Sequence, residues 1–266
     1  MKQLLKKYRI LILIISALLF VGVSTYIYYY KFYIPTIFEN AQSGRYKGKK
    51  GVTFGDSITW YDGKSFFKTH KEYPYKAVGY QEYVRQYFDC QIDNKGISSL
   101  DMTQILNEVI RYKYYNNVSF VTLTSGANDA RKGINLGKIK DIGGDFDRST
   151  FIGAMQIAIE HILNQNKSVD LYLITPINGF FKETGTKDVP GPYKNLNYIS
   201  EDYSKAIIDL GHKYNLKVCD WYNNIEVQND KDYLFGDKIN IPYQLHPTNL
   251  LYNKMGMYLC NIMGDM

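Results

Sequence analysis

The sequence predicts an α/β protein in which helices cover both faces of a central, mostly parallel sheet, preceded by one N-terminal membrane-spanning helix. Three observations predict this architecture. The 266 residues suffice for one sizeable domain and a short appendage. Short apolar runs alternate with segments whose apolar residues recur at helical spacing, an order typical of a parallel sheet. Residues 10–30 carry no charge.

The uncharged segment at the N-terminus is long enough to cross a membrane, since a spanning helix needs about 20 predominantly apolar residues. Residues 1–30 contain no acidic residue, but four basic residues precede the apolar run. The positive-inside rule therefore places residues 1–9 in the cytoplasm and the rest of the chain outside. The basic residues are Lys2, Lys6, Lys7 and Arg9.

A cleaved signal peptide would have the same charged start and apolar middle. However, the end of the uncharged segment is bulky and aromatic, from Tyr26 to Tyr30, and offers no convincing small-x-small cleavage site. We therefore favour an uncleaved signal-anchor helix over residues 10–30, a linker over 31–48 and one domain over 49–266. Under either interpretation the domain lies outside the cytoplasm.

Charge and cysteine content exclude two classes of function. The net charge is +6, and the four basic residues before residue 10 leave only +2 for the remainder. A nearly balanced domain gives no reason to expect nucleic-acid binding. The cysteines are Cys90, Cys219 and Cys260, an odd number without a CxxC pair. They predict neither a disulfide framework nor a zinc site, and we expect small buried side chains.

Five apolar stretches predict the strands of the sheet. The clearest runs are Val52-Thr53-Phe54, stopped by Gly55, and Val118 to Leu123, stopped by Thr124-Ser125-Gly126. The expected strands are residues 51–54, 90–92, 118–123, 171–174 and 216–219.

Five longer segments show helical spacing of their apolar residues. The helix near residue 150 has Ser149 as its expected N-cap, since serine at this position accepts a free backbone N–H of the first turn. The expected helices are residues 76–88, 101–112, 149–164, 197–213 and 249–263.

Ligand sites in parallel sheets form outside the carboxyl ends of the strands, so the segments that follow strands are informative. Ser57, in Gly55-Asp56-Ser57-Ile58, stands where a turn can expose a nucleophilic hydroxyl. Gly96 and Asn128 follow the next two strands, where a backbone and a side-chain N–H can donate to an oxyanion. His246 precedes the last helix and can act as a base. Each segment alone is typical of an ordinary turn, but the four segments in this order predict a catalytic site.

The other three histidines are expected to be structural or solvent-exposed. His161 and His212 lie within predicted helices, and His70 lies in a charged loop.

From about Lys49 to the C-terminus the chain resembles an SGNH (GDSL-like) hydrolase. That family is defined by Ser in a GDS block, Gly in a second block, Asn in a GxND block and His in a terminal block. The matching residues here are Ser57, Gly96, Asn128 and His246. The resemblance implies a flavodoxin-like three-layer fold with five strands. It also implies a Ser57 nucleophile, a His246 base and an oxyanion hole formed by the Ser57 N–H, the Gly96 N–H and the Asn128 side chain.

One departure from the family pattern concerns the group that orients the base. Family members usually carry Asp three residues before the histidine, and this position is Tyr243 here. An orienting group fixes the imidazole tautomer and stabilises the imidazolium. Asp237, a backbone carbonyl and the Tyr243 hydroxyl are candidates for this role, and a Ser–His dyad without a third member is the alternative.

The resemblance and the expected location together imply a serine esterase that removes small acyl groups, with O-acetyl as the expected group, from an extracellular or cell-surface glycan. An O-acetyltransferase for a surface polysaccharide would use the same residues, and a degenerate domain could act as a binding module. The retention of Ser57, Asn128 and His246 argues against the degenerate domain. No cofactor or metal is expected. The expected partners are an acylated small molecule or glycan and, through the N-terminal helix, the membrane.

Overall fold

The computed structural model describes residues 2–32, 35–178, 200–227, 234–236 and 246–264, and these form one sheet of five parallel strands. Its order, β2-β1-β3-β4-β5, is the flavodoxin-like order of doubly wound sheets. The predicted fold class is confirmed. The strands are β1 (Lys50–Phe54), β2 (Gln91–Asn94), β3 (Phe120–Thr124), β4 (Asp170–Ile174) and β5 (Lys217–Cys219).

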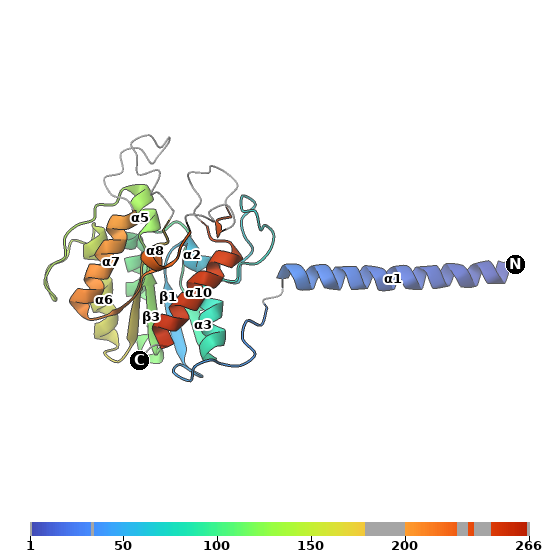
Figure 1. Ribbon diagram of the computed structural model, residues 1–266, viewed down its shortest axis with the longest axis horizontal. Helices are drawn as coiled ribbons and strands as arrows, with labels where there is room; N and C mark the ends of the chain where they lie inside the picture. The colour runs from blue at the N-terminus through green and yellow to red at the C-terminus, as the bar shows by residue number, and fades with distance from the viewer. Residues whose placement is uncertain (1, 33–34, 179–199, 228–233, 237–245, 265–266) are drawn as a thin grey trace.

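Helices cover both faces of this sheet (Figure 1). The helices α4, α6 and α7 share one core with Val121 and Leu123, whereas α3 and α10 share the other with Phe120, which points to the opposite face of β3. Because both faces are covered, β3 is buried along its whole length. The longer helices are α3 (Tyr80–Phe88), α4 (Met102–Arg111), α6 (Phe151–Gln165), α7 (Ser200–Tyr214) and α10 (Asn249–Gly264).

Four shorter helical segments were not expected from the sequence. A helix of one or two turns has too few apolar residues to show the helical repeat, so the sequence pattern does not reveal it. They are α2 (Ser57–Trp60), α5 (Ala127–Lys132), η1 (Tyr115–Asn117, a 3₁₀ turn) and α8 (Trp221–Asn224).

Two helix starts within the described residues differ from the prediction by two or more residues, and residues 197–199, where another helix was expected to begin, lie outside the described residues. The helix expected from residue 76 begins at Tyr80, because Ala77 and the residue before it pair instead with the loop after α2; the Ala77 N–H donates to Lys64 O at 2.9 Å. The N-cap of α6 is Thr150 rather than Ser149, since the Thr150 hydroxyl accepts the Gly153 N–H at 3.2 Å.

The register of the sheet aligns the carboxyl ends of its central strands. Phe54, the last residue of β1, lies opposite Leu123 in β3, and Thr53 lies opposite Asn94, the last residue of β2. The strand order reverses between β1 and β3, which is the point where a crevice forms in sheets of this order. The segments after these three strands therefore meet at one edge.

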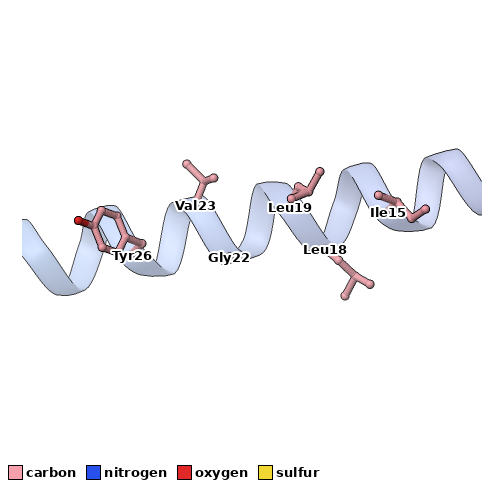
Figure 2. A pocket seen from close by; sticks show the side chains of 6 residues that line it. All are labelled: Ile15, Leu18, Leu19, Gly22, Val23 and Tyr26. Carbon is pink, nitrogen blue, oxygen red and sulfur yellow. The ribbon is translucent and has the colours of Figure 1, made fainter.

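One long helix, α1 (Lys2–Phe32), extends away from the domain (Figure 1). Its stretch Tyr8–Ile27 has a mean hydropathy of 2.6, and 0% of it is buried in the protein. Figure 2 shows Ile15, Leu19 and Val23 projecting from the middle of this helix. By length and composition, α1 is able to cross a membrane.

The segment between α1 and β1 packs on the domain for much of its length. The Ile37 N–H donates to Gln86 Oε1 at 2.6 Å, and the Gln42 N–H donates to Tyr87 O at 2.7 Å, so the chain follows α3. Tyr46 is buried against the sheet. The expected linker over residues 31–48 is thus not a free tether from Ile37 onward, and the packed unit starts ahead of Lys49.

Candidate active site

The candidate nucleophile lies in a tight turn directly after β1. A Cβ on Gly55 would lie 2.1 Å from Thr59 Oγ1, so glycine is needed where the turn meets the following helix. Asp56 caps that helix, because its Oδ1 accepts the Ile58 N–H at 2.9 Å. Ser57 is the first residue of α2 and lies at the carboxyl edge of the sheet.

Side chains from three other elements satisfy the carbonyl groups of α2, which explains how a helix of 4 residues keeps its place. The Tyr252 hydroxyl of α10 donates to Ile58 O at 2.8 Å. Gln81 of α3 and Asn94 of β2 both donate to Thr59 O, each at 2.8 Å. The backbone that carries the nucleophile is therefore fixed by the sheet and by the helical layer that contains α3 and α10.

The structure brings Ser57 and His246 within hydrogen-bond distance, although they are 189 positions apart in the sequence. His246 Nε2 lies 3.0 Å from Ser57 Oγ. The imidazole is half-buried, and the rings of Tyr61 and Phe67 lie at right angles to it with centroids 5.1 Å and 6.5 Å away. These rings limit where the imidazole can move. The Nε2–Oγ distance is the one that a base needs to take a proton from a nucleophile.

Asn128 lies beside the nucleophile turn and is buried. Its Nδ2 donates to Leu100 O at 3.0 Å and to Asp56 Oδ2 at 3.3 Å. Both amide hydrogens thus have acceptors. Asn128 can donate a hydrogen bond to an oxyanion only if the longer hydrogen bond, to Asp56, is shared or broken. Burial raises the pKa of the Asp56 carboxyl, and the Ile58 N–H and the nearby His246 offset this only in part.

A second buried carboxyl holds the turn that carries Asn128. Ser125 Oγ and the Gly126 N–H donate to Asp129 Oδ2 at 2.7 Å and 3.0 Å, and the Met102 N–H donates to Oδ1 at 2.9 Å. Burial raises the pKa of Asp129 to about 7, although these three donors favour the ionised form. Asp129 therefore ties the turn after β3 to the start of α4.

The expected role of Gly96 as an oxyanion donor is not supported by its contacts. Its N–H already donates to Asn94 Oδ1 at 2.9 Å. A Cβ at this position would lie 2.5 Å from Trp60 N and 2.7 Å from the carbonyl carbon of Thr59. Glycine is required at this position because the backbone of α2 lies against it.

The remaining site candidates and histidines divide into three groups. Asp237 and Tyr243 lie outside the described residues. His161 is half-buried in α6 and His212 is exposed on α7, in agreement with a structural or solvent-exposed role. His70 is fully buried, which agrees with the structural alternative, and its Nε2 lies 3.3 Å from the carbonyl oxygen of Pro247, next to His246.

Several residues that build the site were not identified from the sequence. Asp56 and Asp129 stand inside the motifs that marked Ser57 and Asn128, so their positions were visible but their contacts were not. Asn94 joins Thr59 O to the Gly96 N–H, and only the strand pairing of β1 with β2 shows this. Within the part of the chain that the structure describes, no group of three or more His, Cys, Asp or Glu side chains is placed to hold a metal ion.

Comparison with known proteins gives one family and a set of similar folds. A profile of the GDSL-like Lipase/Acylhydrolase family matches residues 53–254. No curated protein matches the sequence. A possible lipase from Chitinophaga pinensis is 19% identical with a TM-score of 0.62, covering 80% of this chain and 97% of its own.

Two further solved structures are similar at the level of the fold. A lipase/acylhydrolase from Enterococcus faecalis is 18% identical with a TM-score of 0.55, covering 81% of this chain and 95% of its own. A catalytic mutant of an acetylxylan esterase from Geobacillus stearothermophilus is 14% identical with a TM-score of 0.54, covering 84% of this chain and 98% of its own.

Proposed function

Because the chain belongs to the GDSL-like lipase/acylhydrolase family, we propose that it is a serine esterase with Ser57 as nucleophile and His246 as base. The observation that carries this proposal is the distance of 3.0 Å between Ser57 Oγ and His246 Nε2 at the carboxyl edge of the sheet. Ester hydrolysis by a serine nucleophile needs a base at this distance, because a serine hydroxyl is a weak nucleophile until an adjacent base accepts its proton.

The geometry supports a two-step mechanism. His246 Nε2 takes the Ser57 proton while Oγ attacks the ester carbonyl, and the resulting imidazolium then gives that proton to the leaving alcohol. Water, deprotonated by His246, attacks the acyl-enzyme, and the carboxylic acid leaves as Ser57 regains its proton. The Ser57 N–H, which has no acceptor among the described residues, and the Asn128 amide would stabilise the oxyanion in both steps.

We propose that the substrate is a small acyl ester, namely an O-acetyl group on a glycan outside the cytoplasm. Two observations support this choice. A solved acetylxylan esterase shares the fold over 84% of this chain. The N-terminal helix α1 is able to anchor the domain to the outer side of a membrane, where surface glycans lie.

Acetate release tests the proposed substrate class. The full-length protein in mild detergent should hydrolyse p-nitrophenyl acetate at least about tenfold faster, in kcat/KM, than p-nitrophenyl octanoate, a ratio equal to about 1.4 kcal/mol of transition-state binding. It should also release free acetate from an O-acetylated xylan. A preference for the octanoyl ester would contradict the acetyl assignment, and transfer of acetyl to an acceptor glycan without free acetate would indicate a transferase.

Membrane attachment tests the proposed location. In intact cells the full-length protein should stay with the membrane after alkaline carbonate washing, because about 20 apolar residues hold it there. Protease added from outside should digest a C-terminal epitope tag and spare an N-terminal one. A soluble form cleaved between residues 25 and 40 would show that α1 is a signal peptide. Protection of the C-terminal tag would show the opposite orientation.

A further inference from the structure

His70 is a buried histidine to which the proposed chemistry gives no role. It lies in the loop between α2 and α3 and is 0% exposed. One face of its ring stacks on Phe66, with centroids 3.8 Å apart and an angle of 3° between the rings. Gly236 is in close contact with the ring as well, since a Cβ on that glycine would lie 1.8 Å from His70 Nε2. The ring is thus held between an aromatic side chain and a backbone that has no room for a side chain.

The two ring nitrogens of His70 face different partners, and this fixes the tautomer of the neutral ring. Nδ1 accepts the N–H of Glu72 at 3.1 Å, so this nitrogen carries no proton. The proton of the neutral ring is therefore on Nε2, which lies 3.3 Å from the carbonyl oxygen of Pro247 and donates to it. His70 thereby joins its own loop to the residue that follows His246.

Further contacts bind the same two loops together around His246. The Lys71 N–H donates to Gly236 O at 2.6 Å, and the Gly236 N–H donates to His246 O at 2.9 Å. The Glu72 carboxylate accepts the Asn249 N–H at 3.0 Å, at the start of α10. The backbone from His246 to Asn249 is therefore held by the loop that contains His70, at His246 through Gly236 and at Pro247 and Asn249 directly.

We propose that His70 is a positioning residue, which holds the His246 loop through the Nε2–H bond to Pro247 O so that the His246 imidazole stays 3.0 Å from Ser57 Oγ. It acts through the backbone and touches neither nucleophile nor substrate. The proposal rests on the proposed function, since it assumes that the Ser57–His246 pair is what the loop must align. A misplacement of a reacting group by about 1 Å can cost roughly a hundredfold in rate.

Three substitutions separate the contacts that His70 makes. His70→Phe keeps a ring to stack on Phe66 and loses the hydrogen bonds to Glu72 and Pro247. His70→Gln offers an amide N–H at the position of Nε2 and can donate to Pro247 O. His70→Asn offers a carbonyl oxygen at the position of Nδ1, for the Glu72 N–H, and its shorter amide does not reach Pro247. The exposed His212→Gln on α7 is the matched control.

We expect the donor to Pro247 to decide the rate. For full-length protein in detergent acting on p-nitrophenyl acetate, His70→Phe and His70→Asn should lower kcat about 10- to 100-fold, with KM changed less than twofold. His70→Gln should recover most of the wild-type kcat, and His212→Gln should match wild type. Thermal unfolding of each variant shows whether it is folded, and if His70→Phe does not fold, the comparison of Gln with Asn decides.

Each contrary result has a distinct meaning. Wild-type kcat in folded His70→Phe or His70→Asn, with only a lower Tm, would show that His70 merely stabilises the fold. Equal losses of kcat in folded Gln and Asn variants would show that the donor to Pro247 is not what matters. A wild-type protein whose turnover does not require Ser57 would overturn the proposed function, and the role of His70 with it.

Discussion

Replacement of Ser57 with alanine is expected to lower kcat for p-nitrophenyl acetate by roughly 10³- to 10⁶-fold, as removal of the nucleophile does in other serine hydrolases. The reason is that no acyl-enzyme can form without the hydroxyl. The fold should persist, because the side chain's hydrogen bond is to the half-buried His246 ring, and α2 is held by contacts from α3, β2 and α10.

The measurement combines kinetics with covalent labelling. A fluorophosphonate should add one phosphonyl group to the wild-type protein, and peptide mapping should place it on Ser57. Ser57→Ala should not be labelled. The matched control is Ser65→Ala, which removes an exposed hydroxyl from the loop after α2 and should leave both kcat and labelling unchanged. Undiminished turnover in folded Ser57→Ala would exclude Ser57 as the nucleophile.

The sequence predicted the sheet well because its strands are buried on both faces. Val118 to Leu123 is a mainly apolar run interrupted only by Ser119 and Thr122, and the observed β3 at Phe120–Thr124 is shifted by only one or two residues. The prediction failed where tertiary contacts overrode a local pattern. Residues 76–79 resemble the start of a helix, but Ala77 pairs with the loop after α2.

The segment from Ile37 to Tyr46 shows the same limit of local patterns. Its composition resembles a linker, yet Gln86 and Tyr87 of α3 accept hydrogen bonds from its backbone. Gln86 lies 49 residues beyond Ile37, and Tyr87 lies 45 residues beyond Gln42, so a local pattern contains no sign of these partners.

The sequence predicted which residues form the candidate site, but not the hydrogen bonds that connect them. The positions of Ser57 and Asn128 after strands and of His246 before the last helix were visible in the sequence. The topology of a parallel sheet brings the segments after such strands to one edge. The hydrogen-bond partners were not visible. Gly96 was interpreted as a donor to substrate, but its N–H is taken by Asn94, two residues away.

The position three residues before His246 matters for how the base is held. Tyr243 replaces the aspartate of the family pattern, and neither Tyr243 nor Asp237 lies within the described residues. The described contacts that hold this loop are made by its backbone, through His246 O and Pro247 O. The support for the base that the structure describes therefore comes from His70 in the loop between α2 and α3, at Pro247 O, and from Gly236, at His246 O.

Removal of the base should cost as much as removal of the nucleophile. His246→Ala is expected to lower kcat by roughly 10³- to 10⁶-fold, because the Ser57 hydroxyl then has no acceptor for its proton during attack. Loss of this ring should have little effect on the free energy of unfolding, because the imidazole is only half-buried.

The double variant gives the sharpest form of this prediction. If Ser57 and His246 act as one unit, the variant lacking both should be no slower than either single variant, because the second substitution removes nothing that still works. Losses that multiply would mean that the two side chains contribute independently, which the distance of 3.0 Å between Nε2 and Oγ argues against. His212→Ala, on the exposed face of α7, should retain wild-type kcat and so exclude a general effect of losing a histidine.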